Sequence, residues 1–133
     1  MGTPVSDEVT RTLASFRREL RGFLRFSELA ALTESLSPQQ HQALLAIHAA
    51  QDHAMTVGEI AENLYLKPHS ASELVSRLEK SGLVIRSSKE GDGRVKVVSL
   101  TEKSIGILSK LSTEHQSELK RLRPLLIKLL SSL

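Results

Sequence analysis

The chain has 133 residues, of which 40% are hydrophobic and 25% charged, and its formal net charge is +3. These values are typical of a single soluble globular domain. Cysteine is absent from the sequence, which excludes disulfides, thiolate metal sites and thiol redox chemistry. Apolar runs stay well short of the ~18 residues that cross a membrane. Arginines interrupt the apolar positions near the start, so we expect no signal peptide and a cytoplasmic location; they are Arg17, Arg18, Arg21 and Arg25.

The basic charge is concentrated in the second half of the chain. Residues 67–103 hold eight Lys and Arg against five Asp and Glu, and residues 104–133 hold five against two. Residues 1–66 hold five against eight. A surface that contacts phosphates requires such a local basic excess, although a solvated charged face gives the same pattern.

The first predicted element is a long helix over residues 6–31. Apolar residues recur there at steps of three and four, with arginines between them, which is typical of an amphipathic helix. The apolar positions are Val9, Leu13, Phe16, Leu20, Phe23 and Leu24.

A second helix is predicted to begin at Ser37. Ser can cap the helix, Pro38 suits its first position, and the Gln40 side chain can reach back to the cap. This helix should end near residues 51–53. It should bury three apolar residues, namely Leu44, Leu45 and Ile47.

Two shorter helices are predicted next. Thr56 and Glu59 form a capping box that opens the first of them. Pro68 begins the second, and Gly82 ends it. The inner residues of the pair are Ile60, Ala61, Leu64, Leu74, Val75 and Leu78.

A hairpin and a final helix complete the chain. Strands are predicted at 83–88 and 95–100, joined by a charged turn that contains Gly91 and Gly93. A long helix should start at Thr101, and Pro124 should kink or split it, because proline removes an intrahelical hydrogen bond. The apolar positions of that helix are Leu108, Leu111, Leu119, Leu122, Leu126 and Leu129.

A hairpin placed directly after two short helices is typical of a winged helix-turn-helix. The predicted fold is therefore mainly α with a small β-wing, in a single domain. Residues 37–100 would form the DNA-binding lobe, and residues 6–36 and 101–133 would form dimerisation helices.

The segment from Leu64 to Thr101 resembles the MarR family of bacterial winged helix-turn-helix transcription regulators. The flanking helices also match the layout of that family. The matching residues are Pro68, Ser72, Leu74, Arg77-Leu78-Glu79-Lys80, Gly82-Leu83-Val84, Arg86, Asp92, Arg94 and Val98-Ser99-Leu100-Thr101-Glu102-Lys103.

The resemblance implies a homodimer that regulates transcription by binding double-stranded DNA at an inverted repeat. In this family the terminal helices form the dimer interface, each recognition helix enters a major groove, and each wing reaches a minor groove. Many members are repressors that small aromatic ligands release from DNA. The resemblance thus implies a repressor that uses no cofactor, and salicylate-like aromatics would be the first effectors to try.

The recognition helix and the wing supply the candidate DNA contacts. Short hydroxyls and an imidazole at a helix start can reach base edges, whereas arginine and lysine suit phosphates or a narrow minor groove. Asp92 is expected to fold the turn that presents Arg94. Lys67 stands where the family usually has Ser or Thr, so the helix loses a side-chain cap worth about 1 kcal/mol. The candidates are Lys67, His69, Ser70, Ser72, Ser76, Arg77, Lys89 and Arg94.

Two further sites are expected on the long helices. Dimerisation is assigned to apolar residues of both ends of the chain, namely Leu13, Leu20, Leu119, Leu122 and Leu126. An effector pocket is expected where the long helices meet the winged lobe, lined by Phe16, Arg17, Phe23, Phe26 and His48.

Other functions find less support in the sequence. Of the five histidines, His41 and His48 lie two turns apart on one helix, too far apart for the usual i, i+4 metal pair, so no metal site is expected. No phosphate loop, nucleophile elbow or carboxylate pair indicates an enzyme. Two alternatives stay open: a winged-helix protein-interaction module without DNA binding, and a small-molecule-binding protein without regulatory activity.

Overall fold

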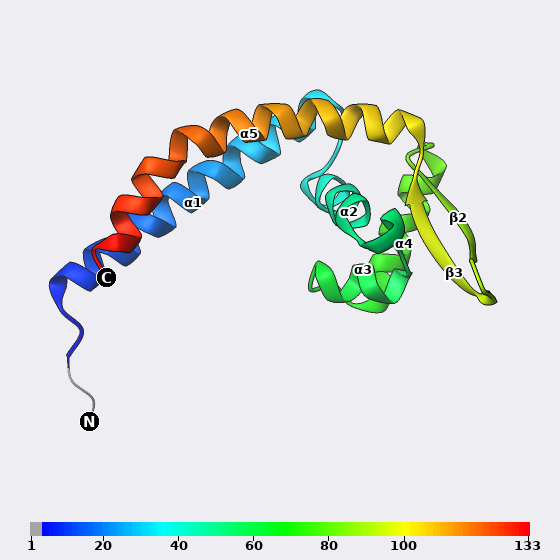
Figure 1. Ribbon diagram of the computed structural model, residues 1–133, viewed down its shortest axis with the longest axis horizontal. Helices are drawn as coiled ribbons and strands as arrows, with labels where there is room; N and C mark the ends of the chain where they lie inside the picture. Colours follow the sequence, from blue (N-terminus) through cyan, green and yellow to red (C-terminus); the bar gives the residue numbers. More distant parts are fainter. Residues whose placement is uncertain (1–3) are drawn as a thin grey trace.

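The computed structural model describes residues 4–133 and consists of an arm of two long helices with a lobe at one end (Figure 1). The arm pairs α1 (Asp7–Thr33) with α5 (Glu102–Ser131), which lie side by side. The lobe contains α2 (Pro38–Ala49), the 3-10 turn η1 (Gln51–His53), α3 (Val57–Asn63) and α4 (Pro68–Lys80). Its sheet comprises β1 (Ala54–Met55), β2 (Val84–Lys89) and β3 (Asp92–Leu100).

The predicted fold class, mainly helical with a small β-wing, is confirmed. The sheet is antiparallel with the order β1-β3-β2, and β2 and β3 form a hairpin that projects from the lobe (Figure 1). The β1 strand was not predicted, and β3 begins at Asp92, before the predicted start at residue 95. None of the helices in residues 4–133 combines the length and the apolar character needed to cross a membrane.

Local capping interactions fix where the helices begin. Ser37 accepts a hydrogen bond from the Gln40 backbone N–H, and Gln40 accepts one from the Ser37 N–H, as the sequence predicts. Thr56 and Glu59 form the second capping box. Such reciprocal bonds satisfy backbone donors that the first turn of a helix leaves free. Gly82 ends α4 with a positive φ of 73°, which an L side chain rarely adopts.

The core lies in the lobe and extends under the start of α5. Its members come from the helices and strands of the lobe and from the end of α1, and they are held mainly by apolar burial. They include Leu44, Ile47, Ile60, Val75, Leu78, Val84, Val98 and Leu111, all almost fully buried. Leu45, predicted to be buried, is instead 40% exposed, because α2 turns that side away from its neighbours.

Pro124 does not split the last helix, which runs unbroken through that position. The proline removes one backbone hydrogen bond, but it lies on an exposed stretch of α5. The carbonyl that the proline leaves without its usual partner can there bond to water, so the helix tolerates it.

Candidate nucleic-acid interface

Helix α4 has one buried face and one polar face. Its buried residues are Ala71, Leu74, Val75 and Leu78, at the spacing of a helix that packs along one side. All the predicted contact residues on this helix and at its cap are exposed, namely Lys67, His69, Ser70, Ser72, Ser76 and Arg77. Lys67 is the N-cap and makes no side-chain capping bond, as expected. The exposed face can therefore form hydrogen bonds with a partner outside the chain.

A shallow cleft separates the start of α2 from α4. Its volume is about 230 Å³, and Ser37, Gln40, Ser70 and Arg77 are among the residues that line it. Arg77 and Glu73 both line this cleft beside the capped N-terminus of α2.

The tip of the hairpin presents Arg94 to solvent, with its side chain 97% exposed. Asp92 Oδ1 accepts a hydrogen bond of 3.1 Å from the Arg94 backbone N–H, and Gly91 takes a φ of 87° in the turn. Asp92 therefore folds the turn that carries Arg94, which is the role predicted for it. Lys89, at the other side of the tip, is also exposed.

Arg86 connects the hairpin to α4. Its guanidinium donates a 3.2 Å hydrogen bond to Ser76 Oγ and lies 3.5 Å from Glu79 Oε1. Sequence reasoning did not assign Arg86 to the site, because nothing in the local pattern shows that β2 runs beside the C-terminal half of α4. The contact fixes the hairpin relative to α4.

Hydrogen bonds also join the start of α5 to the end of α4. Thr101 Oγ1 donates to Gly82 O at 2.8 Å, and Ser104 Oγ donates to Leu83 O at 2.6 Å. Lys103 Nζ donates to Ser81 O at 3.2 Å. Ser104 is fully buried, so its hydroxyl satisfies a carbonyl that water cannot reach.

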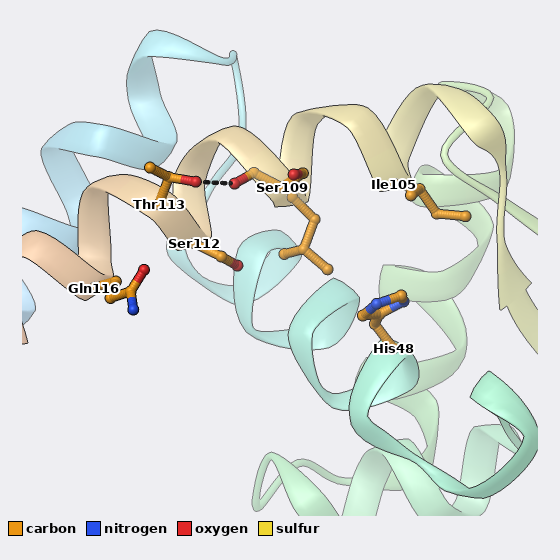
Figure 2. Close-up of a pocket in the computed structure, with 7 residues that line it drawn as sticks. His48, Ile105, Ser109, Ser112, Thr113 and Gln116 are labelled. Atoms are coloured by element: carbon orange, nitrogen blue, oxygen red, sulfur yellow. Dashed lines mark hydrogen bonds between the residues drawn. The ribbon is translucent and has the colours of Figure 1, made fainter.

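A larger cleft of about 570 Å³ lies between α2 and α5 (Figure 2). His48 faces it from α2, and α5 contributes the other lining residues, Ile105, Leu108, Ser109, Ser112, Thr113 and Gln116. Of the five residues predicted for an effector pocket, only His48 is among those that line this cleft. Phe16, Arg17, Phe23 and Phe26 lie on α1 and do not line it.

Phe23 and Phe26 instead pack against His115 of α5. The ring of His115 lies edge-on to both phenylalanines, with centroid distances of 5.9 and 5.3 Å. The ring of His41, from α2, also lies against that of His115, and His41 is 2% exposed. These rings hold α1, α2 and α5 together. Within residues 4–133 no group of three or more potential ligands is placed to hold a metal ion.

The residues predicted for dimerisation fall into two groups. Leu13, Leu20 and Leu119 are 58%, 44% and 50% exposed. Leu126 is half-buried, whereas Leu122 is 2% exposed within the single chain. Leu122 therefore already has its packing partners inside the chain, and the exposed leucines are the ones free to contact another molecule.

Comparison with known proteins identifies the same architecture. The model of the MarR family matches residues 34–95. The organic hydroperoxide resistance transcriptional regulator of Bacillus subtilis is 28% identical over 130 residues, which cover 84% of this chain and 87% of the relative. Further HTH-type transcriptional regulators are matched over 49% to 58% of their own length.

Solved structures share the fold. A MarR family protein from Bacillus stearothermophilus superposes with a TM-score of 0.74 at 24% identity, over 90% of this chain and 82% of that one. A mutant of S. aureus MepR bound to an oligodeoxyribonucleotide superposes with a TM-score of 0.70 at 22% identity, over 88% of this chain and 94% of that one. The family-model match over residues 34–95 and the regulator relatives support a DNA-binding transcription regulator of the MarR type, and the solved structures show the same fold.

Proposed function

We propose that the chain acts as a homodimeric repressor in the cytoplasm, which binds an inverted-repeat operator and is released by a small organic effector. Each α4 would enter a major groove and each hairpin tip an adjacent minor groove. It would act by binding alone and catalyse no reaction. The observation that carries the proposal is the pairing of a polar α4 face with a fully exposed arginine at the tip of a hairpin anchored to that same helix.

The charges of the lobe support contact with DNA. Arg77 and Lys67 lie on or beside α4, and Lys89 and Arg94 lie at the tip of the hairpin. Cations spaced over two elements can contact phosphates on both sides of a groove. The MepR structure with an oligodeoxyribonucleotide shows that a protein of this fold binds DNA. A winged-helix module that only binds proteins would not need this arrangement.

The arm supports self-association. Exposed apolar residues run along both of its helices, including Leu13, Leu20 and Leu24 on α1 and Leu119, Ile127 and Leu130 on α5. Exposed apolar residues in such numbers mark an interaction surface. A second copy of the chain is the partner we propose, because a two-fold symmetric dimer presents two identical helices to two half-sites.

The cleft between α2 and α5 is the place we propose for an effector. It lies where the arm meets the lobe, and its lining combines apolar side chains with hydroxyl and amide groups (Figure 2). A ligand there could shift the equilibrium only if it bound the DNA-free arrangement more tightly. Small aromatic compounds are the first candidates. A binding protein without regulatory activity would instead show the same ligand affinity with and without DNA.

The decisive experiment uses the DNA beside the gene that encodes the chain. A fluorescent duplex from that region, chosen for an inverted repeat, is titrated with the protein and compared with a scrambled duplex of equal composition. We expect binding that is at least ~1000-fold tighter to the repeat, as for specific regulators. Equal affinity for both duplexes at every salt concentration would overturn the proposed function.

A further inference from the structure

Glu73 lies at the centre of the exposed face of α4. Successive helical residues are rotated by ~100°, so the four buried residues of α4 define one side of the helix. The positions opposite that side are His69, Glu73, Ser76 and Lys80. The Glu73 side chain is 58% exposed and also borders the shallow cleft between α4 and the start of α2. It is the one acidic side chain in the middle of the face that our proposed function places in the major groove.

A carboxylate at this position cannot contact the DNA backbone favourably. Phosphates are negatively charged and offer no hydrogen-bond donor, so a carboxylate near them is repelled. The other glutamate of α4, Glu79, lies beside the guanidinium of Arg86. Glu73 has no arginine or lysine within ion-pair distance among the described residues. The hydrogen-bond donors that duplex DNA can offer this carboxylate are the amino groups of its bases.

The major groove offers two such donors, the N4 amino group of cytosine and the N6 amino group of adenine. In an A·T pair the amino group lies between two acceptors, adenine N7 and thymine O4, and both would repel a carboxylate. In a G·C pair the cytosine amino group is the last of the polar groups that the pair exposes in the major groove. It therefore has an acceptor, guanine O6, on one side only. The chemistry of the groove thus favours cytosine as the partner of Glu73.

His69 holds the carboxylate in place. Its Nε2 lies 3.1 Å from Glu73 Oε1, at the i, i+4 spacing that brings two helical side chains together. One carboxylate oxygen is engaged in this contact, and Oε2 stays available to accept a hydrogen bond. Fixing the side chain before binding reduces the conformational entropy that is lost on contact with a base.

We propose that Glu73 reads a cytosine in each half-site of the operator and that His69 is the residue that positions it. This inference rests on the proposed function, because it requires α4 to enter the major groove. It assigns a specificity-determining role to a carboxylate, whereas composition alone directs attention to the cations and hydroxyls of the same helix.

The test is selection of binding sites from a library of randomised duplexes, carried out in parallel with the wild-type chain, E73Q and E73A. We expect the wild type to enrich one cytosine per half-site that both variants no longer require. The E73Q variant should enrich adenine in place of that cytosine, because a carboxamide can both donate to adenine N7 and accept from adenine N6. On the wild-type site, E73A should bind about 5- to 150-fold more weakly, the range for losing one base contact.

Two further variants separate base reading from a general effect of charge. E62Q removes the same charge from the exposed surface of α3 and should leave the cytosine preference unchanged. H69A should keep cytosine as the preferred base but lower the discrimination between cytosine and thymine. If discrimination were unchanged in H69A, the positioning role of His69 would be wrong.

The outcomes distinguish this inference from the function on which it rests. If E73Q and E73A enrich the same base as the wild type at every position, the role of Glu73 is overturned and the repressor proposal stands. If the wild-type chain enriches no sequence at all, both fail. Circular dichroism of the variants checks that the exposed substitution leaves the fold intact.

Discussion

The imidazole rings of His41 and His115 lie 5.0 Å apart, measured between their centroids, at the junction of the arm and the lobe. Both nitrogens of His115 are engaged, Nδ1 with Leu111 O at 2.6 Å and Nε2 with Ser27 Oγ at 2.8 Å. Since a carbonyl can only accept, Nδ1 carries the proton. The Nε2 atom of His41 is buried and has no hydrogen-bond partner among the described residues. Burial, and secondarily the charge that His115 would carry, lower the pKa of His41 below 6.5.

This relationship predicts that acid destabilises the fold. The unfolded chain protonates His41 at its ordinary pKa of 6.5, whereas the folded chain does so only at lower pH. The free energy of unfolding should therefore keep its full value above pH 6.5. It should fall as the pH drops below 6.5 toward the pKa of His41 in the folded state. Urea denaturation followed by circular dichroism at pH 8 and pH 5.5 measures the loss.

The variant H41L should remove part of that loss. At pH 8 it should change the free energy of unfolding by no more than about 1.5 kcal/mol, because leucine fills a similar volume and leaves no polar atom unsatisfied. H69Q, whose imidazole is 85% exposed in the wild type, is the matched control and should retain the wild-type pH dependence. A full acid-induced loss in H41L would exclude His41 as its source.

The exposed arginine of the hairpin predicts a dependence on the flanking DNA. R94A should weaken operator binding by about 1–3 kcal/mol if the side chain enters a minor groove. The effect should be larger where A·T pairs flank the half-site, because their narrow groove is the more negative. Fluorescence anisotropy with A/T-flanked and G/C-flanked duplexes measures it, and R18A, which removes an equal charge from α1, is the control. Equal binding by R94A and R18A on both duplexes would remove the wing from the mechanism.

Arg77 should act on phosphates rather than on bases. R77A is expected to weaken binding to all duplexes similarly. It should also make the plot of log affinity against log salt concentration less steep, by the amount expected for the loss of one phosphate contact. Changes at Ser70 or Ser72 should instead alter which sequence is preferred. Titrations at four salt concentrations with operator and scrambled duplexes separate these effects. A change of sequence preference in R77A, with an unchanged salt slope, would reverse the assignment.

The arm predicts different outcomes for two neighbouring leucines. L119D places a charge on a residue that is 50% exposed, so the chain should stay folded and lose its partner. L122D buries a charge in a position that is 2% exposed within the chain, at a cost of several kcal/mol, and should unfold the arm. Sedimentation should give twice the chain mass of 14.7 kDa for the wild type and the single mass for L119D. A wild type that sediments as a monomer at micromolar concentration would refute dimerisation.

Local signals made most of the fold predictable. The capping boxes at Ser37 and Thr56 and the glycine at position 82 act through neighbours a few residues away, so the sequence shows them directly. The β1 strand was missed because it is two residues long and pairs with Ser99 and Val98, far along the chain. Contacts between distant segments leave no pattern within either one.

The candidate site was predictable to the extent that it follows from one helix and one turn. The exposed positions of α4 follow from its period, and Asp92 and Arg94 follow from the turn. The effector residues could not be placed, because α1 and α5 both carry apolar stripes. Sequence alone does not show that Phe23 and Phe26 pack against His115 while the cleft opens between α2 and α5.

The hydrogen bonds of Thr101, Lys103 and Ser104 make the end of α4 and the start of α5 one mechanical unit. Helix α5 has 30 residues, which at ~1.5 Å per residue gives it a length of roughly 45 Å. If a helix of this length tilts by about 5° about one end, its other end moves by roughly 4 Å, comparable to the ~3.4 Å between stacked base pairs. Helix α4 and the hairpin are bonded to the start of α5. In the proposed dimer, a small change of angle between the two arms would therefore shift both α4 helices and both hairpins away from the positions of their half-sites.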